Sequence, residues 1–97
     1  MTSRYLPPDT QSWKGRPSPD RAYLHENISL LDLAGREVPK QESRAPVLLG
    51  YACDEGVTRN LGRPGAFEGP MALRRALGKM PLLREGTLLW DAGDLAC

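Results

Sequence analysis

Apolar residues are distributed unevenly along the 97-residue chain, and this limits where a hydrophobic core can form. Only 13 residues of the apolar set lie before residue 45, whereas 26 lie from residue 45 onward. The second half alone is dense enough to nucleate a core. Val and Ile together number four against fifteen Leu, which disfavours a sandwich or barrel of β-branched strands.

Within the second half, strand and helix patterns alternate. Residues 47–53 form a short continuous apolar run, which is typical of a strand buried on both faces. Residues 70–80 follow as a helix that opens at a proline and stops before another, and residues 87–91 form a second buried strand. Strand, helix and strand predict a βαβ unit with a parallel pair and a right-handed crossover.

The predicted helix has an apolar face and a basic face. Its apolar residues are expected to face the core and its cations to point to solvent. The core set is Leu73, Ala76, Leu77 and Met80, and the solvent set is Arg74, Arg75 and Lys79.

Residues 1–45 are polar and proline-rich, and we expect an N-terminal arm that Trp13 pins to the body. Ser18–Asp20 offers a helix start, and Leu24, Ile28 and Leu31 fall on one helical face, so a short amphipathic helix ending at Gly35 is predicted. The lone His25 on this helix is expected to be a packing or surface residue. The remaining residues, 46–97, make up the βαβ unit.

Charge and hydropathy exclude two classes of partner. The net charge is +1 and both halves are nearly balanced, so nucleic-acid binding has no electrostatic support. No apolar run is long enough for a membrane span, and the N-terminal residues lack the apolar region of a secretory signal.

Two cysteines make no disulfide framework, so we expect reduced thiols in a cytoplasmic chain, with Cys53 in the core.

The connection between the first strand and its helix, residues 54–69, is unusually long. It leaves the carboxyl end of a strand, where open α/β sheets place their ligands. Its glycines do not have the spacing of a dinucleotide site, and Gly69-Pro70-Met71 does not match a Walker A loop. Both phosphate-binding interpretations therefore fail.

Residues 50–57, 59–66 and 68–77 closely resemble the ureohydrolase (arginase and agmatinase) superfamily, and within it the formimidoylglutamases of histidine degradation. Residues 89–95 resemble that family's second strand with its Asp-x-Gly-Asp ending, and Trp13–Arg16 resembles its N-terminal Trp-x-Gly-Arg segment. The resemblance extends from about Trp13 to Cys97.

This resemblance implies the start of a three-layer α/β/α parallel-sheet fold of the arginase type. It also implies a binuclear manganese centre that hydrolyses N-formimidoyl-L-glutamate, a small-molecule substrate, to L-glutamate and formamide through a metal-activated hydroxide. The full-length enzyme is expected to be a cytoplasmic homo-oligomer.

The family's ligand motifs, Gly-Gly-x-His, Asp-x-His-x-Asp and Ser-x-Asp-x-Asp, do not occur in these residues. We therefore expect an N-terminal fragment that supplies no metal ligand and no catalytic residue, that is inactive alone, and that exposes one sheet face and tends to aggregate. Two alternatives stay open: another ureohydrolase (arginase, agmatinase or a guanidino-acid hydrolase), and a non-catalytic remnant acting as a binding or assembly protein.

Two groups of residues are candidates for a supporting role at the site. The long loop could wall the substrate pocket or could be purely structural. Asp91 and Asp94 could contact the residues that ligate the metal without binding the metal themselves. Alternatively, they could cap turns and pair with a neighbouring arginine. The loop candidates are Arg59, Asn60, Gly62, Arg63 and Gly65.

Overall fold

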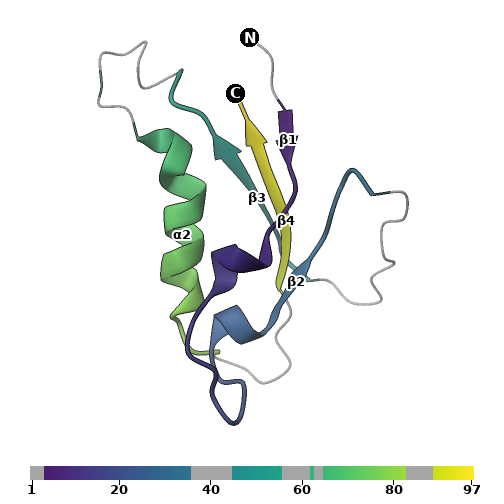
Figure 1. Ribbon diagram of the computed structural model, residues 1–97, viewed down its shortest axis with the longest axis vertical. Coiled ribbons are helices and arrows are strands. Elements are labelled where there is room, and N and C mark those ends of the chain that lie inside the picture. The colour runs from purple at the N-terminus through teal and green to yellow at the C-terminus, as the bar shows by residue number, and fades with distance from the viewer. Residues whose placement is uncertain (1–3, 36–44, 56–61, 63–64, 83–88) are drawn as a thin grey trace.

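The computed structural model describes residues 4–35, 45–55, 62, 65–82 and 89–97, which form a four-stranded sheet with one α-helix (Figure 1). No helix in these ranges is long and apolar enough to cross a membrane. The elements are β1 (Arg4–Leu6), η1 (Thr10–Trp13), η2 (Leu24–Glu26), β2 (Ile28–Leu30), β3 (Val47–Ala52), η3 (Ala66–Glu68), α2 (Gly69–Gly78) and β4 (Leu89–Ala96).

The central strand is β4, which pairs with all three of the others. Strand β3 runs parallel to it along residues 90–96. Because a strand has only two edges, β1 and β2 share the opposite edge, β1 antiparallel and β2 parallel. The predicted parallel pair with a helix between its strands is confirmed, within a sheet that is mixed rather than purely parallel. The N-terminal residues therefore contribute two strands to the same sheet.

The amphipathic helix predicted from Ser18–Asp20 to Gly35 is wrong. A single 3-10 turn, η2, ends at Glu26. The next residue, Asn27, caps it, and its side-chain amide donates to the carbonyl oxygens of Arg21 (2.9 Å) and Tyr23 (2.8 Å). Strand β2 begins at the next residue and pairs with β4. The backbone hydrogen bonds offered by the open edge of β4 thus outweigh a helical spacing of only three apolar residues.

One face of the sheet is covered by α2 and the other is open. Gly50 on β3 lies against Pro70 of the helix, whereas Val47, Leu49 and Tyr51 point the other way and are 48%, 51% and 62% exposed. The expectation of a strand buried on both faces is therefore wrong for the described residues. The expected exposed sheet face is confirmed.

The orientation of α2 also differs from its sequence pattern. Arg74, expected in solvent, is 4% exposed, whereas Leu73 and Met80, expected in the core, are 55% and 53% exposed. The helix turns Arg74 toward β4 because the buried carboxylate of Asp91 and the partly buried carboxylate of Asp94 accept its hydrogen bonds. A charged anchor, rather than the leucine stripe, sets the rotation of this helix.

Gly93 offers a test of how tightly β4 is packed against the N-terminal strand. Its φ is +85°, and an added Cβ would collide with the carbonyl oxygen of Leu6. We expect Gly93→Ala to lower the free energy of unfolding by about 2 kcal/mol or more, because backbone strain and a clash add. Chemical denaturation followed by Trp fluorescence measures this.

The matched control is Gly69→Ala, at a position with helical φ of −54° and no atom within 4 Å of an added Cβ. This variant should change stability by no more than about 0.5 kcal/mol. Equal stability of both variants would contradict the described packing of β4.

Candidate functional site

A buried ion pair lies between α2 and β4. The guanidinium of Arg74 binds Asp91 in bidentate fashion, from Nε to Oδ2 and from Nη2 to Oδ1, both at 2.9 Å. Its Nη1 donates to Asp94 Oδ1 at 2.8 Å, and its Nη2 also donates to the Gly93 carbonyl at 2.9 Å. One helical arginine therefore ties α2 to three residues of β4.

Two further groups complete the surroundings of Asp91. The indole Nε1 of Trp13 donates to its Oδ2 at 2.8 Å, and the Gly93 backbone N–H donates to its Oδ1 at 2.9 Å. Asp91 is fully buried, and Trp13 is 7% exposed. The predicted role of Trp13 as the anchor of the N-terminal segment is confirmed, since a single carboxylate joins that segment to helix and sheet.

The hydrogen bonds keep both partners ionised. Burial by itself raises the pKa of Asp91, but the bonds from Arg74, Gly93 and Trp13 outweigh it and hold this pKa below its usual value. Burial likewise lowers the pKa of Arg74, and the bonds to Asp91 and Asp94 outweigh it and raise that pKa. Asp91 and Asp94 thus accept hydrogen bonds from an arginine, which is one of the two roles predicted for them. The other role, contact with residues that ligate a metal, stays a prediction.

The long loop after β3 is fastened at its base by Asp54. The Oδ1 of Asp54 accepts hydrogen bonds from the backbone N–H groups of Gly65 (2.9 Å) and Phe67 (2.7 Å). These bonds lower the pKa of the Asp54 carboxyl. Gly65 has φ of +144°, which favours glycine and lets the chain turn into η3. One carboxylate therefore joins the end of β3 to the start of the helix.

The loop candidates are only partly within the described residues. Gly62 and Gly65 are both exposed, and Gly65 is the one placed by a contact with Asp54. Arg59, Asn60 and Arg63 lie outside the described residues, so their role in walling a substrate pocket stays a prediction.

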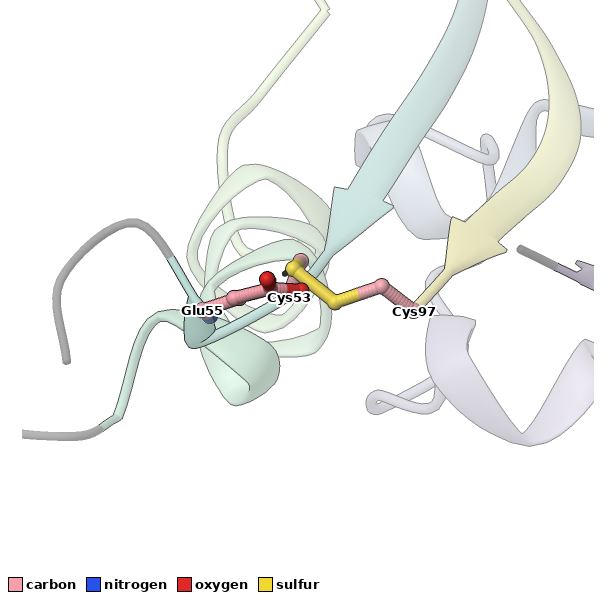
Figure 2. Close-up of side chains that lie close together, drawn as sticks. All are labelled: Cys53, Glu55 and Cys97. Atoms are coloured by element: carbon pink, nitrogen blue, oxygen red, sulfur yellow. Dashed lines mark hydrogen bonds between the residues drawn. A yellow bond between two sulfur atoms is a disulfide. The ribbon is translucent and has the colours of Figure 1, made fainter. Parts of the chain in front are cut away.

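The two cysteines form a disulfide between the ends of β3 and β4 (Figure 2). Ala52 and Ala96 are register partners, which places the following residues, Cys53 and Cys97, side by side with Cα atoms 5.2 Å apart. The expectations of reduced thiols and of a core position for Cys53 are therefore wrong in this structure. Cysteine count alone missed this pair, and only the strand register brings the two residues together.

The described residues do not fit a binuclear manganese centre. Their one cluster of three or more His, Cys, Asp or Glu with converging ligand atoms is Cys53, Glu55 and Cys97. Manganese prefers carboxylate and imidazole ligands, and two of these three are sulfurs.

His25 packs between two glycines. A Cβ on Gly15 would lie 2.5 Å from its Nε2, and one on Gly78 would lie 3.2 Å from its Cβ. Its ring also stacks on Tyr23 with centroids 6.0 Å apart. The predicted packing role of His25 is confirmed. An open cavity of about 200 Å³ lies beside it, and Lys79, which directly follows α2, is among its lining residues.

The Asp91 ion pair predicts a specific dependence of stability on pH. Asp91→Asn removes the charge and leaves Arg74 buried with a weaker partner, so we expect a loss of about 3 kcal/mol at pH 7. Because the pKa of Asp91 is depressed in the folded state, its contribution is present above the ordinary pKa of an aspartate. It is lost as the pH falls through the lower folded value.

Denaturation curves of wild type and variant between pH 7 and pH 2 measure this difference. The two stabilities should converge at the acidic end of that range. Asp20→Asn, at an exposed position, is the control and should change stability by less than about 0.5 kcal/mol at any pH. A constant difference between wild type and Asp91→Asn over the whole range would contradict the ion pair.

Comparison with known proteins gives the chain a set of relatives. It is 45% identical to a formimidoylglutamase of Geobacillus thermodenitrificans and 46% identical to one of Geobacillus kaustophilus, each over 98 aligned residues that include 96% of this chain. It is 37% identical over 90 residues to a formimidoylglutamase of Photobacterium profundum, with 89% of the chain aligned. No family model and no solved structure matches the chain.

The alignments include most of this chain but a much smaller share of each relative. The chain spans 30% of the length of each of the two Geobacillus relatives and 22% of the Photobacterium one. The aligned stretch nevertheless includes nearly all of this chain's residues. The chain is therefore similar to the N-terminal portion of the formimidoylglutamases, and the resemblance that its motifs indicate is confirmed.

Proposed function

We propose that this chain is the N-terminal part of a formimidoylglutamase, a hydrolase that converts N-formimidoyl-L-glutamate and water to L-glutamate and formamide. The observation that carries the proposal is the 46% identity over 98 residues to a protein of that name. Identity at this level over a whole βαβ unit and its preceding strands supports a shared architecture and a shared position in the larger enzyme.

In this proposal the chain acts as a scaffold and as one wall of the substrate pocket. The Arg74 and Asp91 pair holds β4 against α2. Asp54 fixes the base of the loop at the carboxyl end of β3, where α/β sheets place their ligands. Arg59 and Arg63 of that loop would bind the carboxylates of the substrate, which suit bidentate guanidinium groups.

The manganese centre of the proposed enzyme would be built by other residues. The described part of this chain does not fit such a centre, so we assign the metal ligands to the portion of the relatives that this chain does not span. The complete enzyme would be a cytoplasmic homo-oligomer. This chain's own residues would bind and orient the substrate and would exclude water from the pocket.

An exposed apolar strip supports the idea that more protein packs on this unit. Tyr51 on β3 and Leu95 on β4 are register partners, so they lie on the same open face, with Val47 and Leu49 beside them. Each of the four is at least 41% exposed. A contiguous apolar strip along β3 and β4 is unusual for a free surface and is typical of a packing interface.

A chimera tests the proposed activity. Residues 1–97 would replace the matched segment of the Geobacillus kaustophilus relative, and the purified, manganese-loaded protein would be assayed for formamide release from N-formimidoyl-L-glutamate. We expect turnover within about tenfold of the parent enzyme, because the chain supplies scaffold and loop rather than metal ligands. Arginine and agmatine should not be hydrolysed.

A folded, metal-loaded chimera that releases no formamide would contradict the proposal. Preferential hydrolysis of arginine or agmatine would instead favour another ureohydrolase. A circular dichroism spectrum and a metal content equal to those of the parent would show that a negative result is not a failure to fold.

The two hydrogen bonds by which Asp54 holds the base of the loop predict a separate kinetic effect in the same chimera. Asp54→Ala removes the acceptor for two backbone N–H groups, so the loop loses its fixed base. We expect KM to rise about tenfold, with a smaller change in kcat, because the loop binds substrate and does not carry out the chemistry.

Asp9→Ala is the matched control, since the Asp9 carboxylate also accepts a backbone hydrogen bond, from Gln11 at 2.9 Å, but in a turn away from this loop. Its KM should stay within about twofold of the unmodified chimera. An unchanged KM for Asp54→Ala would show that the loop does not shape the pocket.

A further inference from the structure

Two sulfurs and one carboxylate converge at the carboxyl ends of β3 and β4. Cys53 and Cys97 directly follow the register partners Ala52 and Ala96. The backbone N–H of Cys97 donates to the Ala52 carbonyl at 3.2 Å, so strand pairing continues to the level of the cysteines. The backbone therefore holds the two cysteines side by side whether or not their sulfurs are bonded.

Glu55 adds a third ligand from the first residues of the loop. Its backbone N–H donates to Cys53 Sγ at 3.4 Å, and its carboxylate points back toward the disulfide (Figure 2). The ligand atoms of the three residues all lie within 4.8 Å of one another, and all three side chains are partly exposed. The cluster is thus accessible to solutes from the solvent.

The reduced cluster has the chemistry of a thiophilic metal site. Two thiolates and a carboxylate would carry three negative charges, and thiolates select zinc-like cations over manganese and magnesium. At a tetrahedral zinc ion with Zn–S bonds of about 2.3 Å, two sulfurs stand about 3.8 Å apart. Sulfurs on cysteines whose Cα atoms are 5.2 Å apart can reach that separation by side-chain rotation alone.

We propose that the dithiol form of Cys53 and Cys97, together with Glu55, binds a thiophilic divalent cation such as Zn²⁺, and that disulfide formation releases it. Three protein ligands leave the fourth position to water. The proposal rests on these three residues alone and does not depend on the activity proposed above.

The release step is a thiol–disulfide exchange with a small organic disulfide. The two thiolates give up two electrons and form the protein S–S bond, while the S–S bond of the organic disulfide breaks. That molecule takes the two electrons and two protons and leaves as two thiols. The cation, having lost both sulfur ligands, is set free.

Cobalt titration of the intact protein tests the site, because thiolate ligands give Co²⁺ an intense near-ultraviolet charge-transfer band that oxygen and nitrogen ligands do not. We expect the band at one Co²⁺ per chain in the reduced protein, displaced by added Zn²⁺. It should be absent from the protein oxidised with glutathione disulfide and strongly reduced in Cys53→Ser and Cys97→Ser.

Glu55→Gln should keep the band but weaken cobalt binding by at least about tenfold. Loss of a residue that only contacts a metal ligand already lowers metal affinity by about that factor. The matched control is Glu68→Gln, which removes an exposed carboxylate of η3 outside the cluster and should leave binding unchanged. Circular dichroism and thermal melts of every variant identify any loss of fold.

Three results would overturn the proposal. The first is a reduced, folded protein that gives no charge-transfer band. The second is a band that persists unchanged in both serine variants or in the oxidised protein. The third is equal cobalt affinity in Glu55→Gln and Glu68→Gln, which would remove the carboxylate from the site.

Discussion

The bidentate pair between Arg74 and Asp91 is the interaction on which the rest of this structure depends. It joins a residue of α2 to one in the centre of β4, and the same carboxylate receives the indole N–H of Trp13 from the N-terminal segment. Three parts of the chain that are remote in sequence therefore meet at one buried charge. Because a buried ion is costly without partners, these three parts must come together for any one of them to be stable.

This constraint explains the places where sequence patterns failed. Leucine spacing predicted that Leu73 and Met80 face the core and that Arg74 faces solvent, whereas the helix is rotated to bury Arg74. Hydrophobic periodicity assigns no value to a buried charge pair, so it could not find this orientation. The helix predicted before Gly35 failed for a related reason, since Ile28–Leu30 satisfies its backbone groups by pairing with β4, a contact between residues about 60 apart that local propensity does not include.

Other features were within reach of the sequence. The two apolar runs and the helix between them predicted β3, α2 and β4 because short apolar runs on either side of a helical pattern indicate strands, although β3 buries only one of its faces. Trp13 stood out as the one large apolar residue of a polar arm, and it is an anchor. The pairing of Asp91 and Asp94 with an arginine was among the alternatives, although the identity of that arginine was not. The proximity of Cys53 and Cys97 needed the strand register, which composition does not contain.

The residues with proposed functions lie at the carboxyl ends of β3 and β4. Asp54 fastens the long loop there, and the cysteine pair lies beside it. The sheet face that α2 leaves uncovered presents an apolar strip that suits further packing. A rigid buried pair thus supports an edge that is open to ligands, which is the usual division between core and loops in α/β proteins.

The central claim is that the Arg74 and Asp91 pair, with Trp13, forms the organising core of the chain. Hydrogen exchange of the Trp13 indole N–H, followed by NMR, measures this most directly. If the account is right, that proton exchanges only through global unfolding, with the same free energy of opening as the slowest backbone amides of β4. A much smaller opening free energy for the Trp13 indole than for those amides would show that the N-terminal segment detaches while the sheet stays folded, and would contradict the account.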